Sequence, residues 1–276
     1  MQMKKYKTVP MKDARVVIAA PISNVADNIK PVFDNINKLV DEFKEVRVIL
    51  VESNSQDNTY FVAEGLKDYL KCPLELHCIS DNMDPNVNHQ ITHWHLRTAR
   101  LAMARNFYVS RIIESYSDYD YMYCMDFNYS NIEPIRLDGV RSNFEVDVDW
   151  NVLTANQEKG YYDLWALRHP YWCPHNIYGE IWNQIDGWMS VEDQMKLVMD
   201  GKRINILNDA DPVPVDSAFG GSAIYKIPAI IDKNPIHYWL DEKGHREVEH
   251  ISFMKGIGKV FINPKFINNG DQDFTL

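Results

Sequence analysis

The stretch YDYMYCMDFN, residues 119–128, begins as a buried β-strand and ends on an acid, an aromatic and an amide. No glycine or proline turns the chain there, so the polar ending needs an explanation of its own. Asp126 and Asn128 flank Phe127, and in an extended chain both polar side chains would point to the same side. Their oxygens suit Mg²⁺ or Mn²⁺, which predicts a metal site. The alternative is that Asp126 only stabilises the turn after its own strand.

The chain before this stretch alternates between predicted strands and predicted helices. Short runs rich in β-branched residues predict strands at 15–21, 46–52 and 74–80. Apolar residues at helical spacing predict helices within 24–43, 55–70 and 95–115. We expect Pro31 to start or kink the first helix, and an Asp or Asn to cap the second. The alternation predicts a single α/β domain over 1–276, with a mostly parallel sheet flanked by helices.

Ligands of such sheets bind beyond the carboxyl ends of the strands. APISN (20–24), ESNSQDNT (52–59) and DFN (126–128) are therefore expected along one edge. Glu52 ends the second strand, where its carboxylate could accept hydrogen bonds from ribose hydroxyls or a base N–H. No GxGxxG or GxxxxGK[ST] motif occurs, which disfavours a nicotinamide site and excludes a P-loop.

Composition narrows the class of protein further. The formal net charge of −10 argues against nucleic acid as a partner. Four cysteines without paired spacing fit a reducing compartment rather than a disulfide framework. The amino terminus does not have the pattern of a signal peptide, and no run approaches the ~18 apolar residues of a membrane span. A cytoplasmic protein is expected.

The order of motifs resembles that of the GT-A fold glycosyltransferases. VVIAAPISNVADNI (16–29) is similar to their first strand and nucleotide loop, and VESNSQDNT (51–59) to their acidic segment. MARN (103–106) followed by YDYMYCMDFN is similar to their R-N helix and D-x-D strand. The resemblance is closest to the fungal capsule-associated alpha-1,3-mannosyltransferases and related viral and bacterial enzymes. They share segments like YYDLWALR (161–168), GGSAIYK (220–226) and EHISFMKGIGKVFINPKFI (249–267).

The resemblance implies a site made by both halves of the chain. Residues 15–130 would form the nucleotide-sugar-binding half, and 131–276 the acceptor-binding and closing half. The residues expected to bind the nucleotide sugar are Pro21, Ser23, Glu52, Asn54, Arg105, Asn106 and Asp126. The metal ligands would be Asp126, Asn128 and His250, holding Mn²⁺ or Mg²⁺. Asn128 replaces the family's second Asp, which lowers the charge offered to the cation.

The second half offers candidate acceptor-binding and catalytic residues. Aromatic rings suit the apolar faces of sugars, and paired glycines allow the backbone to approach a ligand closely. The expected acceptor residues are Trp165, Trp172, Asp186, Gly220 and Gly221. Asp216 and Glu249 are the candidate bases for the acceptor hydroxyl. The alternatives are core packing for the tryptophans, a turn for Asp216 and a helix amino end for Glu249.

The predicted function is metal-dependent transfer of a sugar from a GDP- or UDP-linked donor to a hydroxyl acceptor, such as a glycan. The transition state would be oxocarbenium-like. An inverting enzyme needs a base and a retaining one can use the leaving phosphate; the mannosyltransferase resemblance implies retention. Two alternatives stay open. One is a sugar nucleotidyltransferase, although the first loop is neither glycine-rich nor basic, and the other is a non-catalytic carbohydrate- or nucleotide-binding protein.

Overall fold

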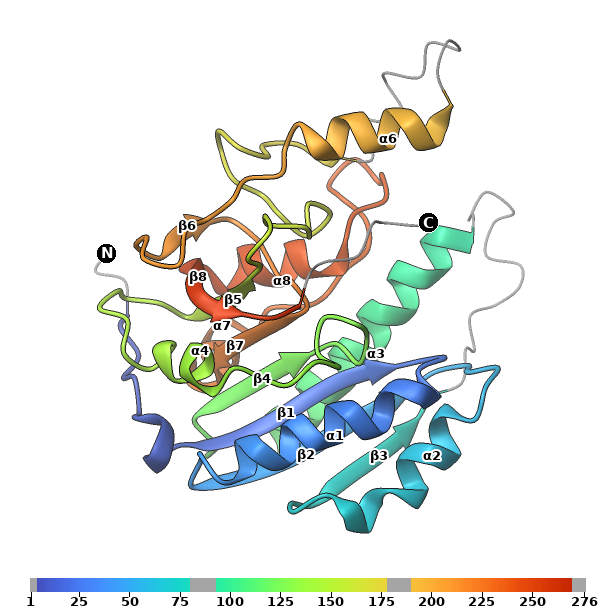
Figure 1. Cartoon of the computed structure of the whole chain (residues 1–276), viewed down its shortest axis with the longest axis vertical. Helices are drawn as coiled ribbons and strands as arrows, with labels where there is room; N and C mark the ends of the chain where they lie inside the picture. Colours follow the sequence, from blue (N-terminus) through green and yellow to red (C-terminus); the bar gives the residue numbers. More distant parts are fainter. Residues whose placement is uncertain (1–3, 80–92, 178–189, 270–276) are drawn as a thin grey trace.

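The computed structural model describes residues 4–79, 93–177 and 190–269 (Figure 1). The strands of this described part are β1 (Arg15–Ile22), β2 (Glu45–Glu52), β3 (Leu74–Cys78), β4 (Tyr121–Met125), β5 (Val152–Asn156), β6 (Val213–Val215), β7 (Ser222–Lys226) and β8 (Val260–Ile267). They form one sheet in the order β3-β2-β1-β4-β7-β5-β8-β6. The pairs β1–β2, β1–β4, β2–β3 and β5–β8 are parallel, and the other three are antiparallel. The predicted single-domain α/β fold is confirmed.

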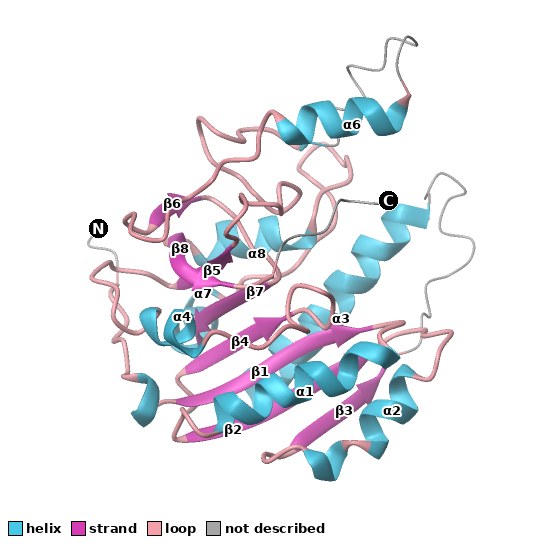
Figure 2. Ribbon diagram, viewed as in Figure 1, coloured by secondary structure: helices cyan, strands magenta, loops and turns pink. Residues whose placement is uncertain are grey.

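Helices cover both faces of the sheet (Figure 2). The α-helices are α1 (Ala26–Val40), α2 (Thr59–Gly65), α3 (His93–Ser115), α4 (Leu137–Ser142), α6 (Val191–Asp200), α7 (Ile227–Lys233) and α8 (Glu249–Ile257). The short 3-10 helices are η1 (Met11–Asp13) and η2 (Lys67–Tyr69). Alternate residues of β1 enter two cores: Ile18 packs in one with Phe33 of α1, and Val17 in the other with Tyr108 of α3. This is why the strands read as continuous apolar runs.

Pro31 lies inside α1, so the expectation that it would start that helix is wrong. Proline removes one backbone donor and crowds the preceding turn, which disfavours an interior position. The helix nevertheless continues to Val40, because Phe33 and Ile36 on its sheet-facing side are fully buried. Burial of this apolar face outweighs the local penalty.

The second helix is shorter than predicted. The α-helix ends at Gly65, and the rest of the expected range forms η2 and bends. Its N-cap residue is Asn58, whose side chain makes no capping hydrogen bond. Asp57 takes that role instead: its Oδ1 accepts from the Thr59 backbone N–H at 2.9 Å, and its Oδ2 from the Ala26 N–H at 3.1 Å. One carboxylate therefore joins the loops that follow β1 and β2.

The antiparallel strand β7 brings the second half of the chain to the end of β4. Met125 pairs with Ser222, and the backbone N–H of Asp126 donates to the Gly221 carbonyl at 2.9 Å. The glycine turn before β7 therefore lies directly beside Asp126. Within the described ranges, no helix is long and apolar enough to cross a membrane.

Candidate active site

Arg105 of α3 lies at the centre of a buried charge cluster beside the end of β4. Its side chain is only 3% exposed, its Nε is 2.9 Å from Glu249 Oε1, and its Nη2 is 3.4 Å from Asp126 Oδ1. The guanidinium also lies over the Phe219 ring, 5.1 Å from the centroid. One buried cation thus joins the strand end of β4 to the first residue of α8. The sequence-predicted residues Arg105, Asp126 and Glu249 are in one cluster.

Asp126 is the carboxylate of this cluster that reaches solvent. Its side chain is 26% exposed, whereas that of Glu249 is 2% exposed. Burial raises the pKa of Asp126 above its usual range, and Glu249 adds to this, while Arg105 and Arg97 oppose it. The chain thus holds a partly desolvated acid where a ligand can reach it, a common property of functional sites.

Asp163, which follows the paired tyrosines 161 and 162, is a site residue that the sequence analysis missed. Its Oδ2 accepts from the Gly220 backbone N–H at 3.0 Å, and its Oδ1 from the Ala166 N–H at 3.3 Å. The pKa of Asp163 is raised to about 6, mainly by burial. The two backbone hydrogen bonds act to lower this pKa, whereas the nearby Asp126 and Glu249 act to raise it. An acid inside an otherwise apolar aromatic segment was the available signal, because an acid is costly to bury.

The two glycines before β7 are required by the packing of the chain itself. Gly220 and Gly221 have φ of +65° and +81°. A Cβ on Gly220 would lie 2.7 Å from the Ala155 carbonyl oxygen, and one on Gly221 would lie 2.7 Å from Ser130 Cβ. The two glycines therefore let this turn pack closely against other parts of the chain itself. Binding of an acceptor by this turn stays a prediction.

Replacing Gly221 with alanine should destabilise the fold by about 2–4 kcal/mol, because the new Cβ is crowded and the positive φ is strained. Chemical denaturation of wild type and variant measures this loss. Gly65→Ala is the matched control: a Cβ there meets nothing within 4 Å, so a change below about 1 kcal/mol is expected. Equal effects at the two positions would contradict the packing argument.

His250 is a buried neutral imidazole next to the cluster. It is 3% exposed and stacks on Phe219 with ring centroids 4.0 Å apart. Burial lowers the pKa of His250 well below its usual value, and Arg105 lowers it further. Its Nε2 is 3.7 Å from Glu249 Oε1, and both ring nitrogens lack a hydrogen-bond partner among the described residues. An unprotonated ring with unused nitrogens is chemically able to bind a cation.

Asn128 lies beyond the end of β4, where the chain is no longer extended. The strand ends at Met125, the chain bends at 127–128, and Asn128 Oδ1 accepts from the Ser130 N–H at 2.9 Å. The rule that alternate residues share a side holds only for extended backbone, so it does not apply to this pair, and binding of a metal by Asn128 stays a prediction. Among the described residues, no three His, Cys, Asp or Glu side chains are grouped closely enough to hold a metal ion by themselves.

Within the described part of the chain, Asp126 could therefore hold a metal ion only together with further ligands. Mg²⁺ is commonly held by one or two carboxylates, with phosphate oxygens and water completing its shell. Asp126 fits that pattern, because it is an accessible oxygen ligand in the cluster. The residues present fit a cation that enters together with a phosphate-bearing ligand.

The loops after β1 and β2 form a hydrogen-bonded rim at the same edge. Asn24 and Asn54 both have φ of +53°, and Asn24 Oδ1 accepts from the Gln56 N–H at 2.7 Å. Glu52 is 5% exposed, and its two carboxylate oxygens accept from the Ser55 N–H at 2.7 Å and the Cys78 thiol at 3.0 Å. Both of its oxygens thus already have partners within the chain. Contact of Glu52 with a ribose stays a prediction.

The remaining nucleotide-loop candidates differ in exposure. Ser23 and Asn54 are exposed, and Pro21 at the end of β1 is partly exposed. Asn106 exchanges two hydrogen bonds of 2.9 Å with the backbone of His237. Asn106 therefore ties α3 to the segment before α8, and its contact with a nucleotide sugar stays a prediction.

The candidate acceptor-binding residues differ in exposure and in their contacts. Asp216 is exposed, and its backbone N–H donates to the Arg168 carbonyl at 2.8 Å. Trp165 and Trp172 are partly buried against the core, and Trp172 Nε1 donates to the Lys202 carbonyl at 2.6 Å. Asp186 lies outside the described residues. An acceptor role for these residues stays a prediction.

Solved structures share this fold. Residues 1–349 of TarS from S. aureus superpose with a TM-score of 0.50 at 12% identity, over 90% of this chain and 57% of that one. The mannosyltransferase PcManGT from Pyrobaculum calidifontis, in complex with GDP-Man and Mn²⁺, gives 0.49 at 13% identity, over 96% and 59%. No protein-family model and no curated protein sequence matches the chain. The chain spans just over half the length of these structures.

The likeness shows that the chain has the GT-A fold of glycosyltransferases. This confirms the fold that the order of sequence motifs implied. Nothing in the comparisons bears on the closer resemblance to the fungal capsule-associated mannosyltransferases, which stays an interpretation of the sequence.

Proposed function

We propose that this protein transfers a sugar from a GDP- or UDP-linked donor to a hydroxyl group of an acceptor such as a glycan. The observation that carries the proposal is a pair of acids at the carboxyl edge of a GT-A sheet. Burial raises the pKa of both acids, Asp126 adds to the rise at Asp163, and both side chains reach solvent in part. A site with two such acids can offer one carboxylate to the donor and one to the acceptor.

We assign Asp163 as the base that takes the proton of the acceptor hydroxyl. A general base is most effective when its pKa is near the working pH, and that of Asp163 is about 6. Each of its oxygens accepts one backbone hydrogen bond, which leaves a further lone pair for the acceptor hydroxyl. Glu249 is less suited, because it is buried against Arg105. Asp216 remains a candidate for orienting the acceptor.

A base at the acceptor hydroxyl favours an inverting reaction. The proton would move from the acceptor oxygen to Asp163, the acceptor oxygen would bond to the anomeric carbon, and the diphosphate would leave with the former bonding electrons. The resemblance to mannosyltransferases implied retention, which needs no such base. The position of Asp163 therefore supports inversion over retention.

The cationic groups near Asp126 would stabilise the departing diphosphate. Arg97 on α3 is exposed and acts electrostatically on Asp126, so it can approach a bound phosphate. Asp126, with Asn128 and His250 as the further candidates, would hold Mn²⁺ or Mg²⁺ brought in with the donor. That ion would neutralise the negative charge that develops on the leaving group.

Thermal unfolding with GDP or UDP, each with and without Mn²⁺, tests donor binding. One nucleotide should raise the midpoint in a metal-dependent way, by an amount equivalent to about 2.7 kcal/mol when its concentration is 100-fold above its Kd. Asp126→Ala should remove the shift. Asp118→Ala is the matched control, because this exposed acid precedes β4 at the opposite end of the strand.

The control should keep the full shift. If neither nucleotide stabilises wild type, the proposal of a nucleotide-sugar enzyme is wrong. A shift that persists in Asp126→Ala would mean that the nucleotide binds away from the strand end. Binding of nucleotide without any hydrolysis or transfer of the matching nucleotide sugar would support the non-catalytic alternative.

A further inference from the structure

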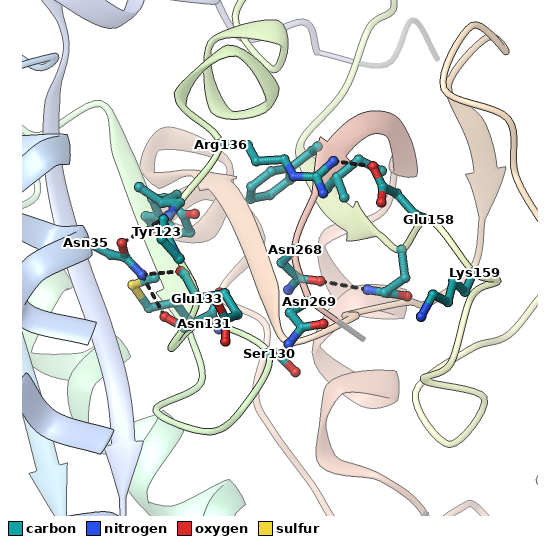
Figure 3. A pocket seen from close by; sticks show the side chains of 16 residues that line it. Asn35, Tyr123, Ser130, Asn131, Glu133, Arg136, Glu158, Lys159, Asn268 and Asn269 are labelled. Atoms are coloured by element: carbon teal, nitrogen blue, oxygen red, sulfur yellow. Dashed lines mark hydrogen bonds and ion pairs between the residues drawn. The ribbon is translucent and has the colours of Figure 1, made fainter. Parts of the chain in front are cut away.

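A cavity lies beside the segment that follows Asp126, next to the glycine turn before β7. It measures about 310 Å³ and is shown in Figure 3. Its lining comes from segments far apart in the chain: Asn35 of α1, Tyr123 and Met125 of β4, and residues 130–131, 133–136, 157–159 and 266–269. Small-molecule sites commonly measure ~300–1,000 Å³, so this cavity has the size for a small ligand.

The wall between this cavity and the candidate active site is made of buried side-chain amides. Gln157 Nε2 donates to the Gly220 carbonyl at 3.1 Å and to Asn268 Oδ1 at 2.9 Å. Asn131 Nδ2 donates to the carbonyls of Asp126 at 2.8 Å and Gly221 at 2.9 Å. These hydrogen bonds hold the wall in one geometry, so the cavity is a built feature of the fold.

Among the described residues that line the cavity, the formal charges cancel. Glu133 and Glu158 carry two negative charges, and Arg136 and Lys159 carry two positive charges. Arg136 is paired with Glu158, and Figure 3 shows this pair at one end of the cavity. A phosphate or nucleotide would need an excess of cationic groups, and an ammonium ligand an excess of acids. The balance favours a neutral ligand.

Several polar groups at the cavity are available to a ligand. The side chains of Asn269 and Glu133 make no hydrogen bond to another described residue, whereas the Asn269 backbone is held by the Ser130 carbonyl at 3.1 Å. Asn268 Nδ2 uses one of its two hydrogens on the Gly220 carbonyl, at 2.6 Å. A side-chain amide and a carboxylate together offer both donors and acceptors, which suits neighbouring hydroxyl groups of one ring.

We propose that this cavity binds a single neutral sugar ring, with its hydroxyls held by Asn268, Asn269 and Glu133. The site is separate from the one that would hold the donor, and binding there needs no transfer reaction. Asn268 also contacts the Gly220 carbonyl, and the Gly220 N–H holds Asp163.

Saturation-transfer NMR tests this with a panel of methyl glycosides of mannose, glucose, galactose and N-acetylglucosamine. The protein is first saturated with the nucleotide that stabilises it most, or with a mixture of GDP and UDP. At least one glycoside should bind wild type. The Glu133→Ala/Asn269→Ala double variant should bind it at least about tenfold more weakly, since two hydrogen-bonding groups are lost. Asp163→Asn, altered in the other site, should bind it as wild type does.

Absence of binding by every glycoside would overturn the proposal, as would equal binding by wild type and the double variant. If Asp163→Asn alone weakens binding, the sugar occupies the active site, which refutes the second site and supports the proposed function. Glycoside binding that depends on Asn269 and Glu133, in a protein that binds no nucleotide, would support this cavity and reject the proposed transferase. The two proposals can thus fail separately.

Discussion

Replacing Asp163 with asparagine is expected to lower the turnover of sugar transfer by about 10²–10⁴-fold, the usual contribution of a general base. Asparagine keeps the shape of the side chain and an oxygen that can accept from the Gly220 N–H, but it cannot take a proton. Donor binding should be unchanged, because Asp126 and Arg105 are left in place. Turnover with a saturating donor, together with the Kd of the nucleotide, measures both quantities.

The pH dependence separates this catalytic role from a structural one. Wild-type turnover should fall as pH drops through about 6, because protonated Asp163 is no longer a base. A free carboxyl of this type titrates near 3.8, so between 3.8 and about 6 the folded state binds more protons than the unfolded state. Folding stability contributed by this group therefore decreases as pH rises through that window.

The asparagine variant should lose this contribution to the slope of stability against pH. Denaturant unfolding at several pH values measures the slope, and pH–rate profiles measure the activity. Unchanged turnover in Asp163→Asn would refute its assignment as the base. A large loss of nucleotide affinity in the same variant would indicate that Asp163 instead contacts the donor.

Replacing Arg105 with methionine is expected to cost about 3–5 kcal/mol of folding free energy, the usual effect of removing one partner of a buried ion pair. Methionine keeps much of the apolar length of the side chain but leaves Glu249, 2% exposed, without its cation. Asp126 loses an interaction that favours its charged form, so its pKa should rise further. Urea unfolding of wild type and variant measures the loss.

Arg111→Met is the matched control, because it removes the same side chain from the same helix at a more exposed position. Arg111 Nε is 2.8 Å from Glu75 Oε2, with side chains 36% and 24% exposed. Exposed pairs contribute roughly 0–1 kcal/mol. The double variant Arg105→Met/Glu249→Gln should recover part of the loss by removing the buried charge. Equal costs at Arg105 and Arg111 would show that the cluster does not behave as a buried ion pair.

Local pattern predicted most of the first half of the fold. The strands expected at 15–21, 46–52 and 74–80, and the strand before Asp126, all lie within or close to the observed β1–β4. Each is a short apolar run, and a strand can be predicted from such a run without knowing which distant residues pack on it. The position of Pro31 was misjudged because tertiary burial outweighed the local penalty of proline. The length of α2 was misjudged because a glycine and local bends outweighed the helical pattern.

The site was predictable in part. Arg105, Asp126, Glu249 and His250 were nominated from the sequence, and the structure brings them into one cluster of ion pairs and stacked rings. Asp163 was missed, because no short motif marks an acid whose neighbours, Gly220 and Ala166, come from separate loops. The shared orientation of Asp126 and Asn128 was expected from an extended chain, whereas the chain bends at 127–128.

The sequence by itself determined the class of fold and the strand end at which polar residues meet, since hydrophobic periodicity and residue order set both. Only the tertiary structure decided which carboxylates are usable. It buried Glu249 against Arg105, left Asp126 and Asp163 partly open to solvent, and raised the pKa of Asp163 to about 6. The reason is physical: the affinity of a carboxylate for a proton depends on burial and on nearby charges, and those are contributed by residues distant in the chain.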